Sequence, residues 1–348
     1  MSKNTSFFIT FKFPDKIQLN LWFFFFGLLF FASCKKPLPA SKHLEGVVFG
    51  TTFHISYTDT SARNFEQPID SLFHLVNTSL STYLPTSLIS RVNAGDALVE
   101  VDTLFSEVFF KAARIYRETE GAFDPTIGVL VNAWGFGPEK PLQDLDALKV
   151  KELLPLVGFD QVQLQQRRVL KKHSKTYFDF NAIAKGFGVD FVARYLESQQ
   201  ISNYLVEIGG ELRARGSNSE GLSWRVGIEK PNVDGSRSLQ KVIVLQDASM
   251  ATSGNYRKYR IDAVTGEKYV HTLDAQTGYP AKRDLLSATV YAPIDCADAD
   301  GYATAFMAMG FEKTKVFLKK HPELSAFLIY VDANGNAQEY SFPEVPNS

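Results

Sequence analysis

The stretch LSATVYAPIDCADADGYATAFMAM, residues 286–309, decides the fold class. Its first seven residues have the apolar and β-branched composition of a buried strand, and the residues from about Cys296 to Met309 predict a helix. A second helix is expected near 312–320 and a further strand at 325–331. Helices and strands interleave here without a regular βαβ rhythm, so we expect an α+β domain rather than a doubly wound sheet.

The same kinds of pattern extend outward along the chain, with no internal repeat and no low-complexity stretch. Strands are expected at 47–57, 203–208, 211–216, 224–229 and 241–245, helices at 69–80, 104–118, 144–155 and 182–198, and a hairpin-like region at 162–180. We therefore expect one domain spanning residues 47–340.

Composition and charge exclude several classes of protein. The chain has 348 residues, 45% of them hydrophobic, and its formal net charge is −1, which excludes intrinsic disorder. Because 37 Lys and Arg are balanced by 38 Asp and Glu, we expect no nucleic-acid partner. Two cysteines exclude a disulfide scaffold and a Cys-rich zinc site. No histidine pair has metal-ligand spacing, so any metal should be a hard cation bound by oxygen.

The N-terminal segment predicts export and lipid anchoring. Three lysines precede an apolar run from Leu21 to Phe31, which is short for a membrane span and is followed by small residues. Phe31-Ala32-Ser33-Cys34 resembles a bacterial lipobox, so we expect residues 1–33 to be a lipoprotein signal peptide and Cys34 to be lipidated. The alternative is an uncleaved anchor with an incidental cysteine. The expected location is extracytoplasmic and periplasm-facing, on a bacterial membrane, with residues 34–46 as a polar, proline-containing tether.

Four segments contain polar and glycine residues that packing alone does not require. They are GAFDPT at 121–126, DFNAIAKG at 179–186, HTLDAQTG at 271–278 and ADADGYATA at 297–305. Taken singly, the first three also fit ordinary turns and helix caps, with Asn181 as one such cap.

The fourth segment gives the strongest chemical indication. Asp300 and Thr304 are four residues apart on an expected helix, so their side chains share one face. A carboxylate and a hydroxyl are hard oxygen donors that suit Mg²⁺. The two side chains could instead cap the helix or face solvent. However, the neighbouring residues are small and apolar, which indicates burial, and a buried carboxylate needs a partner.

At this point the chain resembles the ApbE-like FAD:protein FMN transferases, many of which are lipoproteins. The resemblance extends from about Val47 to Tyr330. Its motifs occur in family order: Phe49-Gly50-Thr51, Ser81-Thr82-Tyr83, Ala122-Phe123-Asp124-Pro125, Asp179 to Gly186, Glu207-Ile208-Gly209-Gly210-Glu211, Ala251-Thr252-Ser253-Gly254, the His271 segment, and Ala299-Asp300 to Thr304. One departure is Ala275, where the family usually has proline; it puts the rigidity of that turn in question.

The resemblance implies a single T-fold-like domain with mixed, mainly antiparallel sheets and flanking helices. It implies a site for one or two Mg²⁺ ions built from the Ala182 main-chain carbonyl, the Asp300 carboxylate and the Thr304 hydroxyl. It also implies an FAD site formed by Phe49, Tyr83, Ala122, Phe123, Asp124, Asp179, Lys185 and Leu273. The residue types agree with these roles, because a lysine suits phosphate and a tyrosine can stack on a flat ring. The absence of GxGxxG after a first strand argues against a Rossmann mode of flavin binding.

The function implied is Mg²⁺-dependent transfer of FMN from FAD to a Ser or Thr hydroxyl of an acceptor protein, with release of AMP. Asp300 and His271 are the expected catalytic residues, with His271 as base or orienter of the hydroxyl because its ordinary pKa is near neutral. His271 could instead be a turn histidine bonded to backbone. The resemblance also implies acceptors that carry a short motif containing Ser or Thr, in membrane redox subunits. Two other functions remain open: an FAD pyrophosphatase that releases FMN and AMP, and a lipid-anchored protein that binds FAD without chemistry.

Overall fold

The computed structural model describes residues 40–142, 145–230, 238–255, 259–261, 268–281 and 283–343. The expected signal peptide and Cys34 lie outside these residues. Among the described helices, none is long and apolar enough to cross a bilayer.

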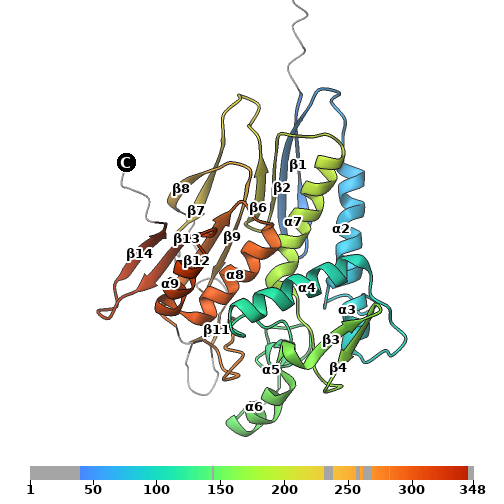
Figure 1. The fold of residues 1–348 in the computed structure, drawn as a ribbon, viewed down its shortest axis with the longest axis vertical. Helices are drawn as coiled ribbons and strands as arrows, with labels where there is room; N and C mark the ends of the chain where they lie inside the picture. Colours follow the sequence, from blue (N-terminus) through green and yellow to red (C-terminus); the bar gives the residue numbers. More distant parts are fainter. Residues whose placement is uncertain are drawn as a thin grey trace, which may run out of the picture. The chain divides into compact units, whose positions relative to one another are not determined.

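Within the described residues, eight strands form one sheet (Figure 1). In spatial order they are β1 (Ala40–Val48), β2 (Thr51–Asp59), β5 (Tyr204–Ile208), β6 (Glu211–Arg215), β9 (Ala248–Gly254), β12 (Leu285–Ala292), β13 (Ser325–Val331) and β14 (Ala337–Phe342). Each neighbouring pair is antiparallel. The expected α+β class with mainly antiparallel sheets is confirmed.

Three two-stranded ribbons accompany this sheet in the described part of the chain. They are β3 (Val162–Gln165) with β4 (Arg168–Lys171), β7 (Trp224–Glu229) with β8 (Leu239–Leu245), and β10 (Tyr259–Ile261) with β11 (Lys268–Val270).

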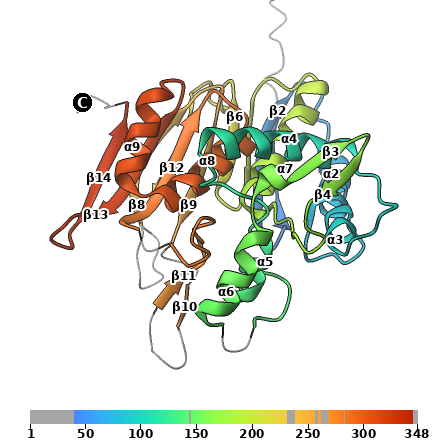
Figure 2. The ribbon, with the colours of Figure 1, turned by 60° about the horizontal axis from the view of Figure 1, so that its bottom comes forward.

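The α-helices of the described residues are between 6 and 18 residues long. They are α2 (Glu66–Leu80), α3 (Leu88–Asn93), α4 (Thr103–Glu118), α5 (Gly128–Ala133), α6 (Ala147–Leu153), α7 (Asn181–Ser198), α8 (Cys296–Met309) and α9 (Phe311–Lys320). In Figure 2, α5 and α6 lie near β10 and β11, at the end of the domain away from α9.

Two apolar layers cover the two faces of the sheet. Along β13, Ala326 and Leu328 belong to the core beneath α4, α7 and α8, whereas Phe327 and Ile329 pack with β7 and β8 on the other face. This alternation follows from the two-residue period of a strand. Figure 1 shows α7 and α8 crossing the helical face, which is where the site lies.

The start of α8 is fixed by a side chain from α7. The Asp190 carboxylate accepts the N–H groups of Cys296 and Ala297, both at 2.9 Å. These amides lack partners within their own helix, so the buried carboxylate caps α8. The two helices are therefore held in a fixed relation at the point where the site begins.

The N-terminal part of the fold differs from expectation. The strand expected at 47–57 is the turn and second arm of a hairpin, with Phe49 and Gly50 at φ +50° and +74°. Such a two-residue turn requires positive φ. In addition, β1 begins at Ala40, so the expected tether of 34–46 is wrong for residues 40–46, which pair with β2. Pairing with β2, rather than the polar composition of this segment, determines its structure.

Candidate active site

The site centres on a close contact between α7 and α8. Gly186 allows it: a Cβ built there would lie 2.4 Å from the Cys296 carbonyl oxygen. One turn further along α8, the carboxylate of Asp300 accepts the Gly186 N–H at 3.1 Å through Oδ2. Asp300 as a whole is 3% exposed. The absence of a side chain at Gly186 thus brings a buried carboxylate against the backbone of α7.

This contact also brings the expected Ala182 carbonyl to the same place. In an α-helix the N–H of one residue faces the carbonyl four positions earlier, so the Gly186 amide faces the Ala182 oxygen. Because the same amide reaches Asp300, the two predicted oxygen ligands converge on it. Ala182 itself is only partly buried.

Lys185 lies between two buried carboxylates. Its Nζ is 2.5 Å from Oε1 of Glu211 and 3.9 Å from Oδ1 of Asp300. Glu211 is 3% exposed and opens β6, directly after Gly209 and Gly210, whose φ values are +63° and +101°. Glu211 occurred in a family motif, but sequence reasoning did not assign it to the site. The two glycines before it were the available signal.

Each charge of this cluster influences the pKa of its neighbours. Burial raises the pKa of Asp300 and of Glu211, and the Lys185 ammonium only partly opposes that shift. Burial also disfavours the charged form of Lys185, but the Asp300 and Glu211 carboxylates outweigh it and raise the pKa of the ammonium. Two carboxylates share one ammonium, so the charges of the cluster can accommodate a further cation.

The Thr304 hydroxyl lies one helical turn beyond Asp300. Its Oγ1 is 3.2 Å from Oγ of Ser253 on β9. Thr304 is half-buried, whereas its neighbours Ala303 and Ala305 are fully buried. The predicted metal residue is therefore accessible, and Ser253 is a contact that sequence reasoning missed.

These residues fit a hard divalent cation. The donors are a carboxylate, a main-chain carbonyl and a hydroxyl, all of them oxygen. Oε2 of Glu211 is buried without a hydrogen-bond partner among the described residues. No cluster of three or more His, Cys, Asp or Glu side chains suited to a metal occurs in the described ranges. A cation here would therefore depend on phosphate oxygens and water to complete its shell.

Two other predicted segments, those of Tyr83 and Pro125, lie at the start of α7. The Asp179 N–H donates to the Pro125 carbonyl at 2.8 Å, and the Asp179 carboxylate accepts the Asn181 N–H at 2.8 Å. Partial burial and the nearby Asp179 charge raise the pKa of the Tyr83 phenol. Tyr83 is 61% exposed, so its ring is free to stack on a ligand.

The side chains of residues 122–124 differ in accessibility. Ala122 is partly exposed, whereas Phe123 is 2% exposed and belongs to the hydrophobic core. Asp124 is also buried, and it accepts the Thr126 N–H at 2.8 Å and the Thr126 hydroxyl at 2.6 Å. Burial raises the pKa of Asp124 to about 6. Phe123 and Asp124 thus hold this loop in shape.

The loop after β11 keeps its turn without the family's proline. The Asp274 carboxylate accepts the N–H groups of Gln276 and Thr277 at 2.9 and 3.2 Å, and it pairs with Arg283 at 2.6 Å. These bonds supply the restraint that Ala275 lacks.

The remaining predicted residues occupy distinct environments. His271 is partly buried beside Phe136, with ring centroids 6.3 Å apart. Leu273 is buried in a cluster with Leu130 of α5 and Val150 of α6. Phe49 packs edge-on against Phe73 of α2 at 5.7 Å.

Asp298 lies on the opposite side of α8 from Asp300. Its Oδ1 is 2.6 Å from Arg114 and 3.4 Å from Lys111, both on α4. The two aspartates, only two residues apart, therefore have different partners, as the helical period predicts.

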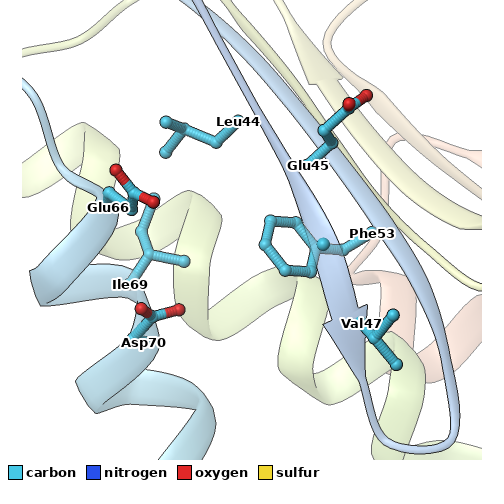
Figure 3. A pocket seen from close by; sticks show the side chains of 8 residues that line it. Leu44, Glu45, Val47, Phe53, Glu66, Ile69 and Asp70 are labelled. Carbon is cyan, nitrogen blue, oxygen red and sulfur yellow. The ribbon is translucent and has the colours of Figure 1, made fainter.

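A pocket of about 220 Å³ lies between β1 and α2 (Figure 3). Its lining is Leu44, Glu45, Gly46, Val47, Phe53, Glu66, Ile69 and Asp70. None of the predicted site residues lines it, so it is separate from the predicted metal and flavin residues.

Oxygen donors beside a lysine are groups that suit a phosphate ester, and comparison with known proteins identifies the family. The ApbE family model matches residues 49–328. A Haemophilus influenzae protein named FAD:protein FMN transferase is 39% identical over 318 residues, which cover 87% of this chain and 90% of the relative. A Vibrio cholerae protein of the same name is 41% identical over 298 residues, covering 82% and 86%.

Solved structures agree with these sequence comparisons. The flavin transferase ApbE from Vibrio cholerae has a TM-score of 0.77 at 36% identity and covers 87% of this chain and 97% of its own. The apo form of the Pseudomonas stutzeri flavinyl transferase ApbE also has a TM-score of 0.77, at 29% identity, with 87% and 95% covered. The chain belongs to the ApbE family.

Proposed function

We propose that this protein transfers FMN from FAD to a hydroxyl of an acceptor protein, in a reaction that depends on Mg²⁺ and releases AMP. Family membership and the names of its relatives support the reaction. The observation that carries the proposal is the convergence of Asp300, Lys185 and the Gly186 amide at one buried contact. Such a cluster suits the pyrophosphate of a dinucleotide.

Each group has a role in that reaction. Asp300, the Ala182 carbonyl and Thr304 would hold Mg²⁺, which neutralises charge on the phosphate oxygens when it is bound. The Lys185 ammonium stabilises the negative charge that develops on the transferring phosphoryl group. His271 accepts the proton of the attacking Ser or Thr hydroxyl, or orients it. The new bond joins the hydroxyl oxygen to the FMN phosphorus, and the broken bond is the one to the oxygen that leaves with AMP.

Accessible aromatic surface supports the flavin side of the proposed site. The exposed ring of Tyr83 stands near Asp179, at the same helix start that leads to Ala182 and Lys185. An aromatic face beside a phosphate site suits the two ends of FAD. We expect FAD to bind far better than FMN, because the AMP half and pyrophosphate add contacts. Titration of flavin fluorescence would measure both affinities.

The direct test is incubation of the protein with FAD, Mg²⁺ and a candidate membrane redox subunit. Mass spectrometry of the acceptor should detect an added FMN on a Ser or Thr. Free FMN without labelled acceptor would indicate a pyrophosphatase instead. Intact FAD, with or without Mg²⁺, would indicate a protein that only binds the dinucleotide.

We further propose that Cys34 is lipidated and that the protein acts outside the cytoplasm, facing the periplasm on a bacterial membrane. The lipobox-like segment Phe31-Ala32-Ser33-Cys34 supports this proposal. The Cys34→Ala variant should remain unprocessed or become soluble, whereas the wild type should partition with membranes. A wild-type protein that stays soluble with an intact N-terminus would contradict it.

A further inference from the structure

The Lys185 ammonium is shared unequally by its two carboxylates. It lies 2.5 Å from Glu211 and 3.9 Å from Asp300. The first distance is that of a charge-assisted hydrogen bond, and the second is too long for one. Asp300 thus attracts the Lys185 ammonium by its charge but makes no hydrogen bond to it.

Glu211 is held rigidly for this contact. It pairs with Ile208 across the β5–β6 turn, and the Gly210 N–H is fixed by Glu207 at 2.6 Å. Its carboxylate is buried, and its Oε2 has no partner within the described ranges. A buried carboxylate is costly unless its contacts compensate for lost hydration. Since the bond to Lys185 is the side-chain bond observed for Glu211, its role lies in that bond.

We propose that Glu211 is a positioning residue that keeps the Lys185 ammonium away from Asp300, so that the Asp300 carboxylate stays available to the divalent cation. This inference rests on the proposed function. An ammonium bonded directly to Asp300 would occupy a ligand oxygen and cancel the charge that attracts the cation. Only another full negative charge can compete with Asp300 for Lys185.

The test is a double-substitution cycle with Mn²⁺ alone as the probe, in which free Mn²⁺ is measured by EPR. Glu211→Gln keeps the shape and removes the charge, so Lys185 should turn to Asp300. Mn²⁺ affinity should fall on the order of 10-fold to 100-fold, as for other groups that orient metal ligands. In a Lys185→Met background the same Glu211→Gln change should have no effect, because no ammonium remains to be held. Equal weakening in both backgrounds, or none in either, would overturn the proposal.

A matched control separates this role from a loss of stability. Asp59 on β2 is 4% exposed and pairs with Arg63 at 2.8 Å, so it is a buried ion-pair carboxylate away from the site. Asp59→Asn should lower the melting temperature without changing Mn²⁺ affinity. Glu211→Asp, which keeps the charge, should retain more Mn²⁺ affinity than Glu211→Gln, and the reverse order would overturn the proposal. Because Mn²⁺ binding requires no flavin transfer, a failure of the proposed reaction would not affect this result.

Discussion

The buried carboxylates on the two sides of α8 have opposite electrostatic environments. Toward α4, Asp298 has two cations within 3.4 Å, Arg114 and Lys111. Toward α7, Asp300 shares one ammonium with Glu211, and that ammonium is bonded to Glu211. The first arrangement satisfies its charges and joins two helices. The second leaves the Asp300 carboxylate without a cation at hydrogen-bonding distance, so its oxygen atoms can bind a further cation.

The comparison shows that burial and acidity alone do not distinguish Asp300, the proposed metal ligand, from Asp298. Asp298 and Asp300 are both buried and are separated by two residues on the same helix. What distinguishes them is the number of cations that each has within bonding distance. We therefore expect activity and stability to respond oppositely at the two positions.

The largest expected effect is at Asp300. Asp300→Ala should lower the rate of FMN transfer by on the order of 10²-fold or more, because it removes the only charged protein ligand of the expected cation. It should leave stability nearly unchanged, since Lys185 keeps its bond to Glu211. The rate is measured as flavin added to the acceptor per unit time, and stability by urea unfolding.

Asp298→Ala is the matched control on the same helix. It should leave most of the activity but destabilise the fold by about 2 kcal/mol, because Arg114 and Lys111 lose a charged partner. If Asp298→Ala abolished transfer while Asp300→Ala did not, the assignment of the two sides of α8 would be wrong.

The second effect concerns the coupling of metal and FAD. A cation with a single protein carboxylate ligand should bind weakly alone and more tightly when FAD supplies phosphate oxygens. By reciprocity, Mg²⁺ should raise FAD affinity by the same factor, expected at roughly 5-fold to 150-fold. Fluorescence titration of FAD at several Mg²⁺ concentrations measures it. If Mg²⁺ and FAD bound independently, the proposal that the cation has too few protein ligands would be contradicted.

A smaller effect is expected at Thr304. Thr304→Ala should lower the transfer rate less than Asp300→Ala, by roughly 10-fold, since water can replace a neutral hydroxyl. Thr304→Ser keeps the hydroxyl and serves as the control. Should the serine variant lose as much activity as the alanine variant, the methyl group, and not the hydroxyl, would be the important part of this side chain.

The last effect concerns stability rather than transfer, and its site is Asp124, a buried carboxylate bonded to Thr126 rather than to a cation. Burial raises its pKa to about 6 in the folded protein, so folding favours the protonated form. The resulting stability is fully present below about pH 4 and is lost as the pH rises through about 6, by up to about 3 kcal/mol. Asp124→Asn should flatten this part of the stability profile. Urea unfolding between pH 4 and 7 compares the two proteins, and parallel profiles would contradict the assignment.

Much of this organisation could be predicted from local sequence. The spacing of Asp300 and Thr304 placed them on one side of a helix, and the same period placed Asp298 elsewhere. The observed bounds of the helices α4, α7 and α8 lie close to the expected ones.

Other features depend on long-range pairing that a local pattern does not contain. Glu211 meets Lys185 only because β6 passes next to α7, and Ser253 meets Thr304 only because β9 lies beneath α8. The strand β9 itself, ASMATSG, consists mostly of small and polar residues and has no β-branched alternation. Likewise, β1 forms because β2 offers it a partner.

The missing side chain at Gly186 has a consequence for the entropy of ligand binding. With the Cys296 carbonyl against its backbone, α7 and α8 have little freedom to slide, so the oxygen atoms of Ala182 and Asp300 are preorganised. If a dinucleotide binds at these oxygen atoms, as we propose, conformational freedom that was lost during folding would not be lost again. On binding, only the substrate and exposed side chains such as Tyr83 would still become ordered. The amides of the α7–α8 contact should accordingly exchange their hydrogens slowly before any ligand is added and hardly more slowly afterwards.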